Sequence, residues 1–253
     1  MLSRKSHPRS VCHRQKTLFL TPEGLGSNSF VLFLVLPVGY LSFVSNLRRN
    51  KMSLQTIVKI SNVTNLSDAR YCAGMGVEML GFSIDTLPVE KFNEIRNWVA
   101  GVKIVGESSS TDLAHITQLT QVYQLDYLQV NLPSLIDGIS LVGLPLILRL
   151  DFFELSESEI MAIFEQYKQK VAYFLLENSD EFAHLENEIL DILNRLSINY
   201  RILLGFGLKE SNIKEVLDEV PLTGIALMGE AELRPGYKDF GEMMDILEAI
   251  EED

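Results

Sequence analysis

Polar side chains recur where short apolar runs of the sequence end, and their types could do chemistry. Carboxylates can accept or deliver protons, amides and hydroxyls can orient a ligand, and a guanidinium can bind an anion. The positions are Ser61 and Asn62, Ser83 and Asp85, Glu107 and Ser108, Gln129 and Asn131, Arg149 and Asp151, and Glu177 and Asn178. Each alone is compatible with a structural role, but together they predict a site for a polar ligand if the fold brings them to one place.

Glycines in the last quarter of the chain form a second candidate site. Gly205 and Gly207 follow an aliphatic run, and Gly229 and Glu230 follow the next one. Glycine lets backbone N–H groups approach a phosphate closely, and the N-terminus of a helix opening near Lys209 would add a favourable dipole. These four residues, from Gly205 to Glu230, are therefore predicted to bind phosphate, with ordinary turn glycines as the alternative interpretation.

The elements that must position these residues alternate regularly from Thr56 onward. Short β-branched or aliphatic runs are separated by longer stretches with helical periodicity, which predicts βα units and a parallel sheet. The predicted strands are residues 57–63, 79–84, 102–105, 127–132, 146–150, 172–176, 201–204 and 224–227. Their spacing of about 20 to 30 residues is the repeat expected of a small (β/α)8 barrel, and an open, doubly wound sheet is the alternative.

A barrel carries its active site at the carboxyl ends of its strands and commonly binds phosphate after strands 7 and 8. The polar strand ends and the late glycines are therefore expected to share one mouth. Helix signals support the same repeat, because Ser156 followed by Glu159 is a capping box and Asn65 or Ser67 can cap an earlier helix. Residues 133–143 are too short for a full helix. Predicted helices with clear signals cover residues 68–74, 157–170 and 181–196.

Charge divides the chain into two parts. Residues 1–52 carry eight Lys or Arg residues against one acid, and residues 53–253 carry 14 against 33, so the formal charges are +7 and −19. Because residues 53–253 are strongly acidic, they repel nucleic acid and anionic membrane surfaces, and neither is an expected partner. The two cysteines, Cys12 and Cys72, lie in different parts. They predict no disulfide framework and no metal site, and a reducing cytoplasm is the expected setting.

Residues 1–52 are predicted to be an N-terminal extension. The barrel itself is predicted to comprise residues 53–253. Residues 30–44 are apolar over about 15 positions, short of the roughly 20 that a membrane-spanning helix needs. Pro37 and Gly39 interrupt the run. The preferred interpretation is that the native protein begins at Met52. A membrane anchor and a cleaved signal peptide are the alternatives.

Seven segments resemble, in order, the motifs of the phosphoribosylanthranilate isomerase family. The most specific are V-K-I-S-N-V-T-N-L-S-D-A at residues 58–69, similar to V-K-I-C-G-[IL]-T-x-x-x-D-A, and R-P-G-Y-K-D at residues 234–239, similar to P-G-x-K-D. Weaker matches lie at residues 76–82, 102–106, 128–131, 174–177 and 205–212.

The resemblance implies a (β/α)8 barrel that needs no cofactor and converts an N-linked aminoaldose phosphate to an aminoketose by Amadori rearrangement, in tryptophan biosynthesis. It places Ser61 at the position of the general base and Glu177 at that of the general acid. The expected partner is a phosphorylated small molecule, while the oligomeric state stays open. Substrate-binding positions are expected at Lys59, Asn62, Gln129, Asn131, Arg149 and Asp151.

The chain departs from the family's pattern at the reacting groups. The family's cysteine base is Ser61, its aspartate acid is Glu177, and the histidine of V-Q-L-H is Asn131. The family's P-K-S-x-R segment corresponds to residues 84–89, which contain no arginine, and its aspartate on the eighth strand is Ala226. A serine hydroxyl acts as a base only when a neighbouring group activates it.

Three functions remain compatible with these residues. The first is an isomerase that uses Glu177 as acid and Glu107 or Asp151 as a substitute base. The second is a barrel that binds a phosphorylated metabolite or a partner protein without catalysing the rearrangement. The third is a different lyase or isomerase that uses Arg149, Asp151 and Glu177.

Overall fold

The computed structural model describes residues 53–178, 184–229 and 241–252. Several predictions made from the sequence lie outside these ranges. They are the extension at residues 1–52 with its apolar run, the start of the helix predicted from residue 181, Glu230, and the motif at residues 234–239. Among the described residues no helix is long and apolar enough to cross a membrane.

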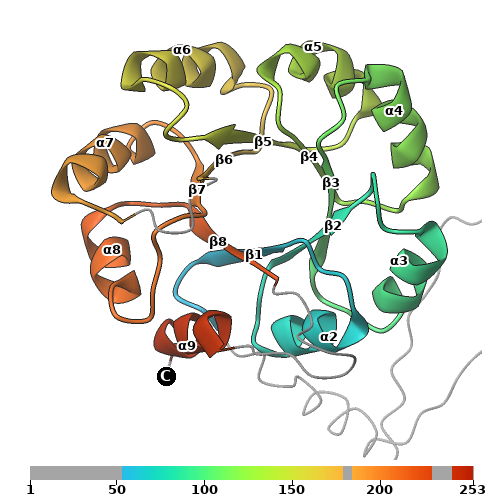
Figure 1. Cartoon of the computed structure of the whole chain (residues 1–253), viewed down its shortest axis with the longest axis horizontal. Coiled ribbons are helices and arrows are strands. Elements are labelled where there is room, and N and C mark those ends of the chain that lie inside the picture. Colours follow the sequence, from blue (N-terminus) through green and yellow to red (C-terminus); the bar gives the residue numbers. More distant parts are fainter. Residues whose placement is uncertain (1–52, 179–183, 230–240, 253) are drawn as a thin grey trace, which may run out of the picture. The chain divides into compact units, whose positions relative to one another are not determined.

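Eight parallel strands close into a barrel in sequence order (Figure 1). The ring closes where β1 pairs with β8, in register from Ile57 with Gly224 to Ser61 with Met228. The predicted (β/α)8 barrel is confirmed, and the open sheet is excluded because such a sheet leaves its two edge strands unpaired. The strands are β1 Ile57–Ser61, β2 Met79–Ser83, β3 Lys103–Ser108, β4 Tyr127–Val130, β5 Leu146–Asp151, β6 Tyr173–Glu177, β7 Ile202–Leu204 and β8 Gly224–Met228.

Helices surround the ring, and their apolar faces cover the outer face of the strands (Figure 1). Asn65, one of two predicted caps, accepts the backbone N–H of Asp68, and Ser156 forms the predicted capping box with Glu159. Between β4 and β5 only short helices form, as expected. The helices are α2 Leu66–Gly74, α3 Val89–Arg96, α4 Leu113–Val122, η1 Pro133–Leu135, α5 Ile136–Ile139, η2 Ser140–Val142, α6 Glu157–Tyr167, α7 Asn187–Ser197, α8 Ile213–Glu219 and α9 Gly241–Ala249.

Two helices begin later than the sequence predicts. α7 begins at Asn187, so His184, placed in a predicted helix, lies before it. α8 begins at Ile213 because Asn212 closes the preceding turn, its side chain accepting Lys209 N–H and donating to the Gly207 carbonyl oxygen, both at 2.8 Å. With only seven residues, α8 is too short to supply the dipole expected beside the late glycines.

The alternation of side chains along each strand explains why polar residues reach the mouth of the barrel. A small cluster fills the barrel interior, with Met79, Val105, Ile147, Leu175, Leu203 and Ala226 among its members. Successive side chains of a strand point to opposite faces, so the residue two positions further along also points inward. These residues are Gly81, Glu107, Arg149, Glu177, Gly205 and Met228. The strand period therefore brings the polar groups to the carboxyl end of the interior.

Candidate functional site

A cavity of about 260 Å³ lies at the carboxyl ends of the strands. Most of its lining is polar, and it includes Ser61, Glu107 and Glu177 from three different strands. Three of the predicted strand-end residues thus meet at one cavity. Its other lining residues are Asn62, Ser83, Asp85, Ser108, Ser109, Gln129, Asn131, Arg149 and Met228.

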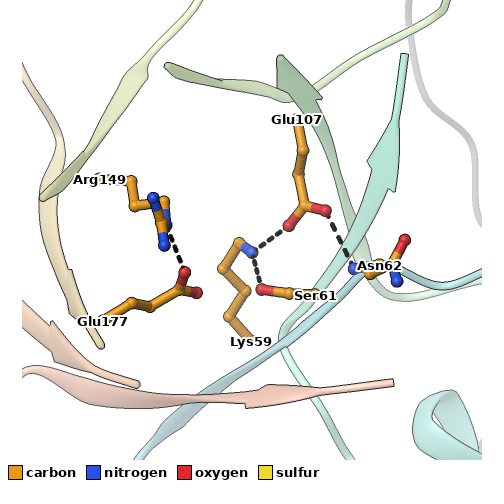
Figure 2. A network of polar contacts seen from close by, with 6 residues as sticks. All are labelled: Lys59, Ser61, Asn62, Glu107, Arg149 and Glu177. Carbon is orange, nitrogen blue, oxygen red and sulfur yellow. Dashed lines mark hydrogen bonds and ion pairs between the residues drawn. The ribbon is translucent and has the colours of Figure 1, made fainter. Parts of the chain in front are cut away.

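Lys59 joins Ser61 to Glu107 beneath this cavity (Figure 2). Its side chain is fully buried, and its Nζ donates to Ser61 Oγ at 2.6 Å and to Glu107 Oε1. The other carboxylate oxygen, Glu107 Oε2, accepts the backbone N–H of Asn62 at 2.9 Å. Lys59, a predicted substrate contact, is not among the residues that line the cavity, and its described side-chain contacts are with Ser61 and Glu107.

Gly81 provides the space in which Lys59 from β1 reaches Glu107 from β3. A Cβ atom at this position of the intervening strand β2 would lie 2.1 Å from Glu107 Oε1 and 3.1 Å from Lys59 Nζ. A glycine inside a strand often marks such a close approach. This role was not predicted from the sequence, although Gly81 interrupts an apolar strand and was the available signal.

Arg149 from β5 and Glu177 from the neighbouring strand β6 form a second ion pair at the mouth (Figure 2). Arg149 Nε donates to Glu177 Oε2 at 2.5 Å, and the side chains are 26% and 14% exposed respectively. Both groups are therefore partly accessible to a ligand. Glu177 keeps a carboxylate at the family's acid position, but the only oxygen free of this ion pair is Oε1.

The remaining predicted ligand contacts divide between two cavities. Asn62, Gln129 and Asn131 line the central cavity, and Gln129 is 5% exposed with no hydrogen-bond partner for its Oε1 among the described residues. Asp151 instead lines an adjacent cavity of about 330 Å³, which Asn131 and Arg149 also border. As a substitute base, Glu107 is therefore better placed than Asp151, because it shares the cavity of Ser61.

Asp85 links the loops that follow β2 and β3. Its Oδ1 accepts the Ser108 hydroxyl at 2.8 Å, and its Oδ2 accepts Ser109 N–H and Oγ at 2.7 and 3.1 Å. These hydrogen bonds fix a carboxylate at the edge of the cavity, in the segment where the family's arginine is missing. The contribution of Ser109 was not foreseen from the sequence, since it lies in a loop with no distinctive spacing.

A separate cavity of about 380 Å³ lies beside the ends of β7 and β8. Gly205 and Gly207 line it, while Gly229 does not. The N–H groups of Gly205 and Gly229 already donate to Leu176 O and Ser61 O at 2.8 Å. Of the predicted phosphate glycines, Gly207, with φ of 68°, is therefore the one whose backbone is not already committed to the sheet.

The two cavities adjoin, because Met228 lines both of them. Gly205 lies against the acid position, and a Cβ there would meet Glu177 Cγ at 2.7 Å. One ligand could thus extend from the Gly207 turn over Glu177 toward Ser61. Glu242, in the first turn of α9, is the one charged side chain among the described residues that line the outer cavity.

Cys72 does not replace the missing base. It lies in α2, fully buried, and burial raises the pKa of its thiol to about 12. A thiol in this environment stays protonated at neutral pH and is chemically inert. The described residues also contain no cluster of three or more His, Cys, Asp or Glu side chains that could hold a metal ion.

These features define a (β/α)8 barrel with an ionisable site at its carboxyl-end mouth, the place where barrels carry their active sites. No protein-family model matches the chain. Two curated relatives, both named N-(5'-phosphoribosyl)anthranilate isomerase, do match it. The one from Sulfurihydrogenibium sp. is 24% identical, covering 77% of this chain and 98% of the relative, and the one from Petrotoga mobilis is 25% identical, covering 76% and 96%.

Solved structures show the same architecture. The phosphoribosylanthranilate isomerase from Thermotoga maritima aligns with a TM-score of 0.63 at 20% identity, over 77% of this chain and 98% of that one. Another, solved in complex with reduced 1-(o-carboxyphenylamino)-1-deoxyribulose 5-phosphate, aligns with a TM-score of 0.59 at 22% identity, over 77% and 98%. The chain is thus similar in sequence to curated phosphoribosylanthranilate isomerases, and it shares the barrel fold of the solved ones.

Proposed function

We propose that this barrel binds a phosphorylated aminoaldose at its mouth and isomerises it to the aminoketose, as in tryptophan biosynthesis. The curated relatives carry the name of this activity, and one similar solved structure is a complex with reduced 1-(o-carboxyphenylamino)-1-deoxyribulose 5-phosphate. The observation that carries the proposal is the convergence of Ser61, Glu107 and Glu177 on one cavity. The ligand's phosphate would lie at the Gly207 turn, and its sugar would extend across the adjoining cavity.

In the proposed reaction an acid protonates the ring oxygen, the ring opens, and a base removes the proton from C2. Glu177 occupies the acid position, and the oxygen that can carry the transferred proton is Oε1, since Oε2 accepts from Arg149. Glu177 is one methylene longer than the family's aspartate, which moves the carboxyl group by about 1.5 Å. Gly205 provides room beside this longer side chain.

Glu107 is the proposed base. Lys59 and the Asn62 N–H hold its two oxygens in place, and each oxygen retains a lone pair that can accept a proton. Ser61 has a different task, because its Oγ accepts a hydrogen bond from Lys59 and its hydroxyl hydrogen remains available to donate. It would orient a ligand oxygen, such as the one that becomes the ketone.

A second candidate, binding without turnover, is favoured by the Arg149–Glu177 ion pair. The ion pair requires the carboxylate form of Glu177, whereas a general acid must carry a proton. A barrel that keeps this pair intact would retain the phosphorylated ligand but not open its ring.

Turnover of N-(5'-phosphoribosyl)anthranilate, followed as loss of its fluorescence by the purified chain, separates the candidates. We expect turnover that falls at least a hundredfold in Glu107→Gln and in Glu177→Gln. Glu157→Gln is the matched control, because Glu157 makes an exposed ion pair with Arg195 outside the barrel. No turnover together with thermal stabilisation by ribose 5-phosphate would support the binding function, and the absence of both would refute the site.

We also propose that residues 53–253 form one domain that works in the cytoplasm. The free thiol of Cys72 and the strongly acidic composition support this setting. The same charge argues that the barrel has no nucleic-acid partner. Fractionation of the native cells tests this proposal. We expect the protein in the soluble fraction, and its detection in the membrane pellet would contradict the proposal.

A further inference from the structure

Arg149 has more hydrogen-bond donors than its ion pair uses. A guanidinium carries several N–H groups on three nitrogens, and only Nε of Arg149 donates to another described residue, Glu177. The side chain is 26% exposed and borders both the central cavity and the adjacent cavity of about 330 Å³. Its terminal nitrogens are therefore available to an anionic group of a ligand in either cavity.

Arg149 is also the one cation that such a group can reach. Among the described residues that line the two cavities, no other carries a positive charge. Lys59 is fully buried and held by Ser61 and Glu107. The remaining charged lining residues are acids, namely Asp85, Glu107, Asp151, Glu154 and Glu177. A ligand carboxylate is therefore stabilised only where it meets the guanidinium.

The adjacent cavity can hold an aromatic ring beside this guanidinium. Its volume is about 330 Å³, and an apolar cavity of roughly 150 Å³ is enough to bind benzene. The apolar residues of its lining are Leu132, Pro133, Leu150, Leu155 and Ile163. A carboxyphenyl ring placed here can direct its carboxylate to Arg149, which borders the same cavity.

The pairing of Arg149 with Glu177 matches the chemistry at one carbon of the proposed substrate. In N-(5'-phosphoribosyl)anthranilate, C1 of the sugar bears both the ring oxygen, which must be protonated, and the nitrogen that carries the carboxyphenyl group. A carboxylate ortho to this nitrogen lies close to the ring oxygen. The neighbouring strands β5 and β6 hold the guanidinium and the Glu177 carboxyl group side by side in the same way (Figure 2).

We infer that the substrate's carboxylate binds Arg149 and thereby drives protonation of Glu177, the acid of the proposed reaction. This inference rests on the proposed function. The ligand carboxylate accepts N–H groups of the guanidinium and shares the positive charge that had belonged to Glu177 alone. Two carboxylates then face one cation, and a proton from solvent relieves their repulsion. Glu177 delivers this proton to the ring oxygen, which opens the ring.

The charged groups around Glu177 favour this proton uptake. On β5, Asp151 pairs in register with Glu177 and adds negative charge beside Arg149. On β7, the neighbour of Glu177 is Gly205, which carries no charge. Across the cavity, the negative charge of Glu107 is balanced by Lys59. Arg149 is therefore the group that keeps Glu177 ionised before the ligand arrives.

Calorimetry with two stable ligands that differ in one group tests the inference. They are reduced 1-(o-carboxyphenylamino)-1-deoxyribulose 5-phosphate and its counterpart with a plain phenyl ring. Each is titrated into the purified full chain at pH 7 in two phosphate-free buffers of different ionisation enthalpy, which gives the number of protons taken up. We expect the carboxylate ligand to bind at least about tenfold more tightly and to take up more protons, by up to about one per site. The phosphate is common to both ligands, so its own protonation cancels.

Two variants should respond differently. Arg149→Gln should bind the carboxylate ligand no more tightly than its counterpart, because the cation is lost. Glu177→Gln should bind the carboxylate ligand more tightly than wild type and take up no additional proton, because the guanidinium has no internal carboxylate partner. A merely structural ion pair would instead weaken both ligands alike in both variants. Glu157→Gln, on the outer surface, should behave as wild type, and thermal midpoints verify that each variant is folded.

The outcomes distinguish this inference from the proposed function. If wild type binds both ligands with equal affinity and equal proton uptake, yet turns over N-(5'-phosphoribosyl)anthranilate, the inference is wrong and the proposed function stands. If the carboxylate ligand binds more tightly but takes up no additional proton, the coupling to Glu177 is wrong. If neither ligand nor ribose 5-phosphate binds, the proposed function fails and the inference fails with it.

Discussion

Replacing Glu107 by Gln tests whether the buried lysine depends on its carboxylate partner. Lys59 is fully buried and has two partners, Ser61 Oγ and Glu107 Oε1. Glu107→Gln keeps an oxygen at the same place but removes the charge. Lys59 would then be a buried cation paired only with neutral oxygens, a situation that proteins avoid because desolvating an ammonium is costly.

The magnitude follows from the burial of the two partners. Removing one member of a buried ion pair costs about 3–5 kcal/mol, and Glu107→Gln belongs at the lower end because the amide oxygen still accepts from Lys59. Lys59→Met should cost less, about 1–2 kcal/mol, because Glu107 is 13% exposed and keeps its bond from the Asn62 N–H. The double variant leaves no unpaired charge, so we expect a coupling free energy of about 2 kcal/mol.

Urea unfolding of the four proteins, followed by far-ultraviolet circular dichroism at pH 7, measures this coupling. Equal slopes against urea concentration are required, because a changed slope would mean that the compactness of a state had changed. If Glu107→Gln cost less than about 1 kcal/mol, or if the two substitutions were additive within about 0.5 kcal/mol, the ion pair would not stabilise the site as described.

Two further predictions concern the Lys59–Glu107 ion pair, and a third concerns the buried thiol of Cys72. Gly81→Ala should displace Glu107 and lower turnover at least tenfold in the fluorescence assay, because the new Cβ would lie 2.1 Å from Glu107 Oε1. Ser61→Cys should react with iodoacetamide at pH 7 faster than a free cysteine, because Lys59 stabilises the thiolate, while buried Cys72 stays unlabelled. The raised pKa of Cys72, from 9.0 to about 12, stabilises the fold fully below pH 9 and loses this contribution as pH rises. Urea unfolding at pH 10.5 should show wild type losing about 2 kcal/mol more than Cys72→Ala, relative to pH 8.

The sequence predicted the barrel because local signals and the long-range pattern agree. The eight apolar runs are short and β-branched or aliphatic, and the stretches between them carry caps such as Asn65 and Ser156. Strand ends moved by one to three residues. The start of α8 moved because the Asn212 side chain bonds within the turn, a contact that no propensity scale contains.

The site was only partly predictable. The predicted strand ends placed Ser61, Glu107 and Glu177 at one mouth, because the carboxyl ends of parallel strands meet at one rim, and these residues do line one cavity. They did not reveal that Lys59 lies below the cavity, since residues of the same strand face lie at different depths once the strands tilt in a barrel. The engaged N–H groups of Gly205 and Gly229 likewise depend on the register of the closed ring.

The position of Lys59 explains where the base of the proposed site lies. Because Gly81 leaves space over β2, the ammonium from β1 reaches the carboxylate on β3 and holds Ser61 Oγ at the same time. In the proposed site the proton acceptor has therefore moved from β1 to β3, and the C2 hydrogen of the ligand must point toward Glu107.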